Sequence, residues 1–211
     1  MEFAQVVRAR RMVRNYDPER PVPPEVLDRL LDHAVRAPSA GFSQGWGFLV
    51  LDDPTDRARF WAATAPDPHA RGRWLTGMRR APLIVVPHAN KSAYLDRYAE
   101  PDKGWTDRDP DRWPVPYWHV DTGFAALLML LTAVDEGLGG CFFGIPRERL
   151  AAYRAEFGVP DEFTPIGALT VGYRAPDHRS ASLSRGRRPI DQVVHRGQWG
   201  GPFGGQAPER Q

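Results

Sequence analysis

The 211-residue chain contains a single cysteine, and only two of its 28 basic residues are lysines. One cysteine excludes a disulfide framework and any zinc or iron–sulfur site built from several cysteines. The six histidines are scattered without the spacing of metal ligands, so no metal site is predicted. The excess of arginine over lysine suits planar, bidentate contacts to phosphate or carboxylate groups.

Long hydrophobic runs are absent as well. The longest apolar run, residues 123–134, is shorter than the about 20 residues that a membrane-spanning helix needs. The first residues show no basic region followed by an apolar core, so no signal peptide is predicted. A net charge of +2 is too small to indicate nucleic acid. These absences predict a cytoplasmic protein with neither a membrane nor a nucleic-acid partner.

The composition itself, 42% hydrophobic and 26% charged, is that of an ordinary globular protein. We predict a single domain over residues 1–199 and a flexible C-terminal tail over residues 200–211. Hydrophobic spacing and breaker residues give the order of the elements. The predicted helices cover residues 3–12, 26–35, 57–63, 121–136 and 146–157, and the predicted strands cover residues 47–51, 83–86, 141–143 and 166–173.

Three further features follow from this pattern. Residues 91–118, rich in Pro, Asp, Arg and Trp, are predicted to form a long loop with one helical turn. The helix over residues 121–136 is apolar on nearly every side, which predicts burial against a partner chain as well as a core. Glycines are expected to end two of the helices, namely Gly137, Gly139 and Gly140 after residue 136 and Gly158 after residue 157.

Two segments indicate a ligand site. Residues 37–46 (APSAGFSQGW) join a helix to a strand and offer hydroxyl and amide groups together with close backbone approach. The cluster Arg10, Arg11 and Arg14 supplies permanent positive charge, and a second basic group lies at residues 185–189. Together they predict a site for a flat, polar-edged ligand that carries a phosphate. The alternative is that the first arginines form only a solvated helix end.

Two familiar motifs do not fit their context. Gly41, Ser43 and Gly45 match the G-x-S-x-G pattern of hydrolases, but the order here is helix, loop, strand, the reverse of a nucleophile elbow. Residues 137–140 follow a helix and lack the third glycine of a dinucleotide-binding loop. The sequence therefore predicts neither a serine hydrolase nor a Rossmann domain.

Taken in order, residues 10–16, 37–44, 137–140, 166–173 and 185–189 resemble the nitroreductase superfamily of FMN-dependent NAD(P)H oxidoreductases. The resemblance runs from Phe3 to Trp199. It implies an α+β fold with a central four- to five-stranded, mostly antiparallel sheet flanked by helices. It also implies an intertwined homodimer with FMN at each of two interface sites.

Carried over by position, the resemblance implies that Arg10 and Arg14 hold the FMN phosphate from one side, and Arg185 and Arg187 from the other. The full set of implied cofactor-binding residues is Arg10, Arg11, Met12, Arg14, Ser39, Phe42, Gln44, Gly139, Gly140, Arg185 and Arg187. Ser39 and Gln44 would lie along the polar chain and ring edge of the flavin, and the two glycines against the ring. This chain departs from the family pattern twice, with Met12 where a serine is usual and Phe42 where an asparagine is usual.

The chemistry implied is transfer of hydride from NADH or NADPH through flavin N5 to an electron-poor acceptor such as a nitroaromatic, a quinone or an enone. It requires no side-chain acid or base, and none is evident. A flavin or deazaflavin protein of the same fold that performs a biosynthetic oxidation, or that sequesters or consumes flavin, is an alternative. A basic nucleic-acid-binding protein is a second alternative.

Residues 91–118 hold three of the seven tryptophans. Aromatic side chains at this density either pack together or bind something. In the resembling family this segment often shapes the acceptor pocket. We therefore predict that Trp105, Trp113 or Tyr117 stacks on an aromatic acceptor, with His119 close by.

Overall fold

The computed structural model describes residues 1–65, 73–177 and 180–203, without the side chains of Arg73 and Ala181. The chain divides into two compact units, Met1–Asp177 and His178–Gln211. The prediction of one domain through residue 199 stays a prediction. Of the predicted tail, residues 204–211 lie outside the described residues.

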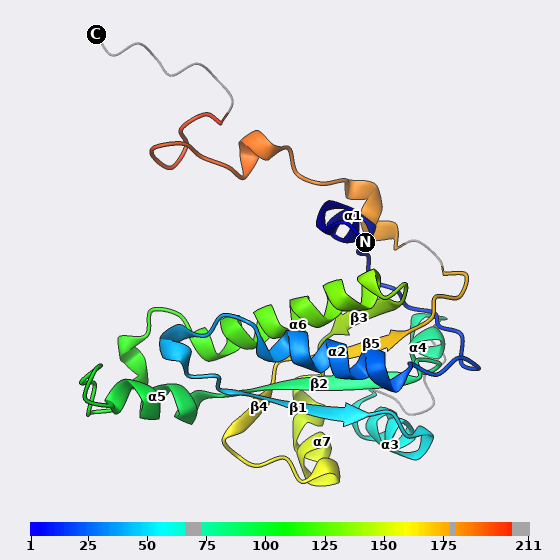
Figure 1. Cartoon of the computed structure of the whole chain (residues 1–211), viewed down its shortest axis with the longest axis horizontal. Helices are drawn as coiled ribbons and strands as arrows, with labels where there is room; N and C mark the ends of the chain where they lie inside the picture. The colour runs from blue at the N-terminus through cyan, green and yellow to red at the C-terminus, as the bar shows by residue number, and fades with distance from the viewer. Residues whose placement is uncertain (66–72, 178–179, 204–211) are drawn as a thin grey trace. The chain divides into compact units, whose positions relative to one another are not determined.

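The first unit is built on one antiparallel sheet (Figure 1). Its strands lie in the order β1-β2-β5-β3, with β4 also paired to β2, and every strand pair is antiparallel. The strands are β1 (Trp46–Leu51), β2 (Leu83–Asn90), β3 (Gly139–Phe143), β4 (Phe163–Pro165) and β5 (Ala168–Gly172). The predicted α+β fold with a four- to five-stranded, mostly antiparallel sheet is confirmed.

Helices cover both faces of this sheet (Figure 1). The helices of the first unit are α1 (Phe3–Ala9), α2 (Pro24–Val35), α3 (Pro54–Thr64), α4 (Arg73–Met78), α5 (Lys91–Ala99), α6 (Tyr117–Asp135) and α7 (Leu150–Phe157). α2 and α6 pack on one face of the sheet, and α3, α4 and α7 pack on the other. Short 3₁₀ turns are η1 (Ala40–Phe42), η2 (Pro110–Arg112), η3 (Arg147–Arg149), η4 (Ala181–Arg185) and η5 (Ile190–Gln192). The sequence did not predict α4.

Two hydrophobic cores result from the alternation of side chains along β2. Leu83 and Val85 face the core that contains α2 and α6, whereas Ile84 and Val86 face the core that contains α3, α4 and α7. Because successive side chains of a strand point to opposite faces, a continuous apolar run such as this one is buried on both sides. β2 is therefore the central strand on which both helical layers rest.

β2 does not end at Pro87, as the sequence predicted, but continues to Asn90. The strand pairs with β5 over Leu83–Val85 and with β4 over His88–Asn90, so Pro87 lies opposite the break between them. Its carbonyl accepts the N–H of Ile166 at 3.0 Å in that break. A proline is tolerated there because no ladder partner needs its missing N–H.

The predicted loop over residues 91–118 was wrong at both ends. Residues 91–99 form α5, which begins at Asn90 because that side chain caps the helix by accepting the N–H of Ala93 at 3.1 Å. α6 begins at Tyr117, four residues before the predicted start at 121. Between them lies a shorter connection that contains η2.

The glycines after the helices also have different roles from those expected. Gly137 ends α6 with a φ of 76°, but Gly139 and Gly140 belong to β3. Gly158 caps α7 in the left-handed conformation, with a φ of 60°, so that prediction is confirmed. The predicted strand over residues 166–173 corresponds to β5 alone, and the sequence did not predict β4, which precedes it.

α6 is long and apolar enough, by length and composition, to cross a membrane. Half of its most apolar stretch is buried inside the protein, as in a helix that covers the core of a sheet. Its inner face packs on α2 and on β2, β3 and β5.

Candidate functional site

Residues 10–16, here called the arginine segment, leave α1 and run along the edge of the sheet. Met12 forms a parallel bridge with Gly140, and the N–H of Val13 donates to the carbonyl of Gly140 at 3.0 Å. Val13 and Tyr16 are fully buried, and the hydroxyl of Tyr16 donates to the carbonyl of Val13 at 2.7 Å. The backbone that carries the arginines is therefore fixed by the core.

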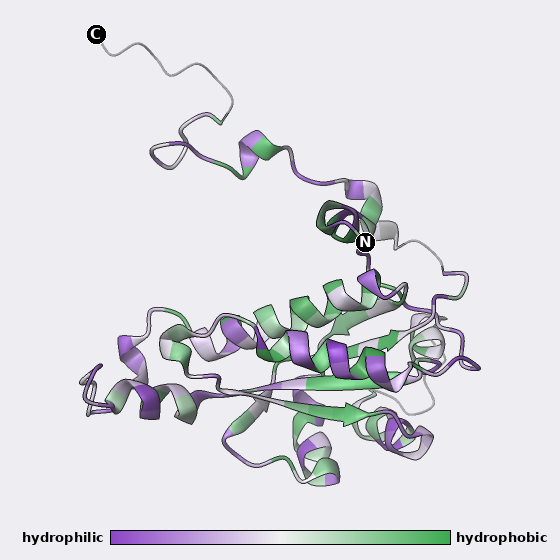
Figure 2. Cartoon of the chain, in the orientation of Figure 1, coloured by the Kyte–Doolittle hydropathy of each residue, from purple (hydrophilic) through white to green (hydrophobic). Residues whose placement is uncertain are grey.

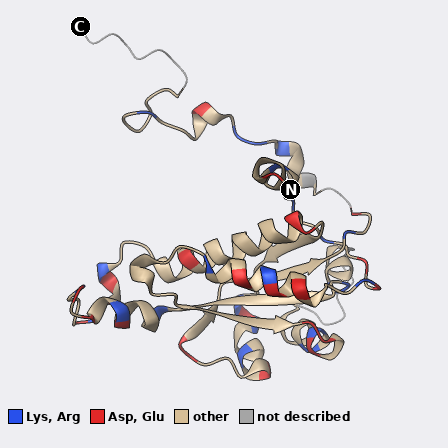
Figure 3. Ribbon diagram, viewed as in Figure 1, with Lys and Arg blue, Asp and Glu red and all other residues tan. Residues whose placement is uncertain are grey.

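The guanidinium groups of Arg10, Arg11 and Arg14 have no ion pair or hydrogen bond with any other residue that the structure describes. Their backbones are engaged: the N–H of Arg10 donates to the carbonyl of Val6 at 3.0 Å, and the N–H of Arg14 donates to Oδ2 of Asp177 at 2.9 Å. Figure 3 shows positive charge on the segment that leaves α1. Three unpaired cations on a rigid backbone can receive an anion.

The structure gives a reason for the methionine at position 12. Its sulfur accepts the backbone N–H of Phe142 at 3.4 Å, and its side chain contacts both hydrophobic cores. The side chain therefore joins the arginine segment to β3. A serine would be too short to fill that space.

Residues 39–44, here called the serine loop, hold an unusual backbone conformation. Phe42 and Gln44 have positive φ angles of 55° and 50°, and Gly41 has 61°. The hydroxyl of Ser39 accepts the N–H of Gln44 at 2.8 Å and so closes the loop on itself. The loop exposes 75% of the Phe42 side chain. Large residues with positive φ are strained and often mark functional sites.

The serine loop is attached to a buried carboxylate, Asp121, that the sequence analysis missed. The N–H of Ala40 and the hydroxyl of Tyr94 each donate to Oδ2 of Asp121 at 2.8 Å. Asp121 is only 3% exposed, and burial raises the pKa of Tyr94 above its usual range. The hydroxyl of Ser39 lies 3.4 Å from that of Tyr94.

A lone carboxylate in an otherwise apolar stretch of helix was the signal that could have pointed to Asp121.

A further contact with the serine loop comes from α5, where Nε of Arg97 donates to the carbonyl of Gly41 at 2.9 Å. Asp102 in turn holds Arg97 through two bonds of 2.7 Å.

The arginine segment and the serine loop lie at opposite ends of the sheet (Figure 1). The serine loop precedes Trp46, which pairs with Ala89 near the end of β2. The arginine segment lies beside β5 and β3, next to the beginning of β2. Eight extended residues span roughly 25 Å, so a single chain does not bring Arg10 and Ser39 together.

Gly139 and Gly140 are buried strand residues, and packing explains why both are glycines. A Cβ atom at Gly139 would lie 2.6 Å from Val13, and one at Gly140 would lie 2.8 Å from Leu130. These contacts are internal to the core. Contact of either glycine with a flavin ring stays a prediction without support from its surroundings.

Arg185 ends η4 and Arg187 follows it, both exposed, in the second unit. Neither side chain has a hydrogen bond or ion pair with another described residue. Their convergence with Arg10 and Arg14 on one phosphate stays a prediction.

The structure brings the predicted acceptor-binding aromatics together. Trp113 lies at the centre, with ring-centroid distances of 5.5 Å to Trp105 and 5.6 Å to Tyr117. Tyr98 lies 4.5 Å from Trp113 and also covers Gly41 of the serine loop. The aromatic cluster consists of Tyr94, Tyr98, Trp105, Trp113, Tyr117 and Trp118. Most of its rings therefore pack on one another.

Two members of the predicted acceptor site are more accessible. Tyr117 is 37% exposed at the beginning of α6. The ring of His119 lies 6.1 Å from that of Trp118, and burial lowers its pKa. Acceptor binding by these residues stays a prediction.

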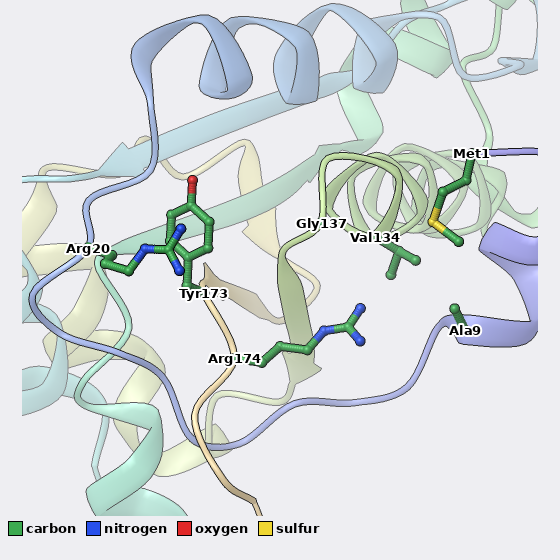
Figure 4. A pocket seen from close by; sticks show the side chains of 7 residues that line it. All are labelled: Met1, Ala9, Arg20, Val134, Gly137, Tyr173 and Arg174. Carbon is green, nitrogen blue, oxygen red and sulfur yellow. The ribbon is translucent and has the colours of Figure 1, made fainter.

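A cavity of about 310 Å³ opens beside the end of α6 (Figure 4). The guanidinium of Arg20 lies 3.5 Å from the centre of the Tyr173 ring, and Arg174 donates to the carbonyl of Leu138 at 2.9 and 3.1 Å. The lining residues are Met1, Ala9, Arg20, Val134, Gly137, Tyr173 and Arg174. Both cations are engaged inside the protein, and none of the predicted cofactor-binding residues lines this cavity.

In residues 1–65, 73–177 and 180–203, no group of three or more His, Cys, Asp and Glu side chains is arranged to hold a metal ion. The buried Cys141 has its pKa raised by burial to about 11, which leaves its thiol protonated at neutral pH.

Comparisons with known proteins agree on one family. The model of the Nitroreductase family matches residues 7–173. A protein of Methanothermobacter thermautotrophicus, provisionally named NADH dehydrogenase/NAD(P)H nitroreductase, is 27% identical over 87% of this chain and 83% of its own. The NADH dehydrogenase of Thermus thermophilus is 28% identical over 88% of this chain and 91% of its own.

Solved structures share the fold. A provisionally named nitroreductase of Exiguobacterium sibiricum, in complex with FMN, superposes with a TM-score of 0.71 at 21% identity. The similarity covers 92% of this chain and 96% of that one.

Proposed function

Because the chain belongs to the nitroreductase family, we propose that it is an FMN-dependent oxidoreductase. Hydride would pass from NADH or NADPH through flavin N5 to an electron-poor acceptor such as a nitroaromatic, a quinone or an enone, and this chemistry belongs to the cofactor. The task of the protein is then to bind the flavin, to orient it and to leave one face of its ring open. The observation that carries this proposal is the arginine segment.

The groups present fit an FMN molecule. Arg10, Arg11 and Arg14 offer unpaired guanidinium groups for a phosphate, which forms its strongest hydrogen bonds with such donors. At the other end, Ser39 and Gln44 offer a hydroxyl and an amide on a loop that the core holds in place. These groups suit the polar edge of a flavin.

A site that uses both ends needs two copies of the chain, because roughly 25 Å separates the ends within one copy. α6 carries few charges along its length (Figure 3) and is mostly apolar (Figure 2). Its outer face exposes four apolar side chains at helical spacing, each 37–45% exposed: Tyr117, Val120, Phe124 and Leu127. An apolar stripe of this kind favours association, which supports a homodimer with FMN at each interface site.

The experiment uses the purified full chain. We expect a yellow protein that releases FMN on denaturation and whose flavin absorbance bleaches when NADH or NADPH is added without oxygen. Bound FMN that neither nicotinamide bleaches would favour the alternative of a flavin-sequestering protein or a biosynthetic oxidase. Failure to bind added FMN would contradict the proposal, and binding of a deazaflavin in its place would favour the other cofactor.

A further inference from the structure

The serine loop is held in a conformation that its own sequence does not favour. Phe42 and Gln44 both lie in the left-handed region of backbone space, which large side chains rarely adopt. Phe42 gains little from burial, since 75% of its side chain is exposed. Contacts from elsewhere in the protein must therefore stabilise the loop.

Those contacts come from two helices that lie outside the loop. Asp121 on α6 accepts both the N–H of Ala40 and the hydroxyl of Tyr94 on one oxygen, at 2.8 Å each. Asp121 is buried and has no ion pair with any described residue, so these two donors are what compensate for its lost hydration.

A hydrogen-bonded chain extends from this carboxylate into the loop. The proton of the Tyr94 hydroxyl is directed to Asp121, so Ser39 is the donor in its 3.4 Å contact with Tyr94. The oxygen of Ser39 then accepts the N–H of Gln44 at 2.8 Å. The two residues proposed to meet the flavin are thereby linked to one buried carboxylate.

We propose that Tyr94 and Asp121 are positioning residues, which hold the serine loop in its flavin-accepting conformation before the cofactor arrives. The inference rests on the proposed function and deepens it. A preformed loop spares the ligand the free-energy cost of ordering it, so loss of either residue should weaken flavin binding without removing a flavin contact.

The test compares Tyr94→Phe with Tyr98→Phe. The first variant keeps the ring of Tyr94 and removes the hydroxyl that reaches Asp121. The second removes, from the same helix and the same aromatic cluster, a hydroxyl that has no hydrogen bond with another described residue. We expect about tenfold weaker FMN binding in Tyr94→Phe, which corresponds to about 1.4 kcal/mol, and less than about twofold in Tyr98→Phe.

Riboflavin provides a second measurement. Because the serine loop is assigned to the ring side of the cofactor, Tyr94→Phe should weaken riboflavin and FMN binding equally. In the flavin-free protein, amide hydrogen exchange at Ala40 and Gln44 should also accelerate in Tyr94→Phe and not in Tyr98→Phe. Because the exchange measurement needs no flavin, it tests the conformation of the serine loop separately from the proposed function.

Asp121 has its own matched pair. Asp121→Asn keeps an oxygen that can accept both hydrogen bonds, whereas Asp121→Ala removes it. We expect Asp121→Ala to lose flavin affinity by about tenfold or more and Asp121→Asn to restore most of it.

The inference is overturned if the parent binds FMN and Tyr94→Phe binds it equally well, with unchanged exchange at Ala40 and Gln44. Flavin affinity that falls equally in Tyr98→Phe also overturns it, because the loss would then come from the aromatic cluster as a whole. A parent chain that binds neither FMN nor riboflavin overturns the proposed function, and the inference with it.

Discussion

The guanidinium groups of Arg10, Arg11 and Arg14 have no ion pair or hydrogen bond with another described residue. The core fixes their backbone, because Val13, which precedes Arg14, and Tyr16, which follows it, are both fully buried. Because the backbone is already ordered, an anion that binds here has only the side chains of the arginines to order. These properties suit the proposed phosphate site, although Arg10 also stands at the end of α1 as its C-cap.

Replacing Arg10 with Ala should weaken FMN binding by about 1.5–3 kcal/mol, because a hydrogen bond to a charged group is lost. Riboflavin, which lacks the phosphate, should bind almost as well as before. Both affinities can be measured by quenching of flavin fluorescence. Arg36→Ala is a suitable control, since Arg36 is exposed and already paired with Asp32. Equal losses for both ligands would place Arg10 away from the phosphate.

His88 gives the fold a dependence on pH. The side chain is 4% exposed, its Nε2 lies 3.0 Å from the hydroxyl of Tyr153, and burial lowers its pKa. The unfolded chain, with a histidine pKa of about 6.5, binds a proton before the folded chain does. The contribution of His88 to stability is therefore complete above about pH 6.5 and is lost as the pH falls below that value.

Urea unfolding at pH 7.5 and pH 5.5 should show this loss in the parent, and His88→Gln should reduce it. His195→Gln, in the second unit, serves as the control. An identical pH dependence in the parent and in His88→Gln would show that other groups cause it.

Local motifs were enough to single out the arginines, Ser39 and Gln44 as candidates, since each belongs to a short segment of distinctive composition, and their role stays a prediction. Asp121 and Tyr94 could not be found in that way. Asp121 reaches Ala40 across 81 residues of sequence and Tyr94 across 27, and neither spacing has any local signature. A hydrogen bond between distant segments is known only when the fold is known.

Among the elements, α5 and the connection after it determine the surroundings of the serine loop. Asn90 starts the helix as its cap, and Tyr94 is buried one turn later. The sequence analysis missed α5 because the prolines and aspartates of residues 100–116 indicated a loop for the whole segment. The only local sign of the helix was its capping asparagine, Asn90. Helical spacing of apolar residues was sufficient for α2, where Val26, Leu30 and Ala34 all face the core.

The aromatic cluster should divide into packing residues and an acceptor-binding residue. Trp113 contacts five aromatic rings, so Trp113→Ala should lower the free energy of unfolding by about 2 kcal/mol or more. Tyr117 is 37% exposed, so Tyr117→Ala should instead change the apparent affinity for aromatic acceptors while FMN content stays intact. Thermal unfolding and steady-state kinetics with a nitroaromatic and a non-aromatic acceptor measure these effects.

Trp105→Ala completes this series. If all three variants retain the acceptor preferences of the parent, the cluster only packs and the predicted acceptor role is wrong.

At the scale of the whole molecule, the apolar outer face of α6 is the surface through which we expect two copies of the chain to associate. Leu127→Asp places a charge on a side chain that is 45% exposed in the middle of the apolar stripe, and should convert a dimer to a monomer. Light scattering measures the mass directly. Val35→Asp, at a side chain that is 47% exposed at the end of α2, should remain a dimer.

If Leu127→Asp is a monomer, it should also lose FMN, because each site is expected to need both copies. A stable monomer that still holds flavin would contradict the dimeric site.

The fold was predictable where an element has a distinctive local sequence pattern. The apolar strands β1 and β3 and the long helix α6 have such a pattern, whereas the continuation of β2 through Pro87 does not. That proline is tolerated only because β4 and β5 leave a gap opposite it, and the gap is a property of the assembled sheet.

The separation of the two half-sites along β2 has a genetic consequence. A chain damaged in the arginine segment still carries a sound serine loop, and a chain damaged in the serine loop still carries sound arginines. When two such chains pair in the proposed dimer, one of its two sites collects both defects and the other site collects none. Two inactive alleles of this protein are therefore expected to complement each other, and their mixed dimer is expected to bind one flavin instead of the proposed two.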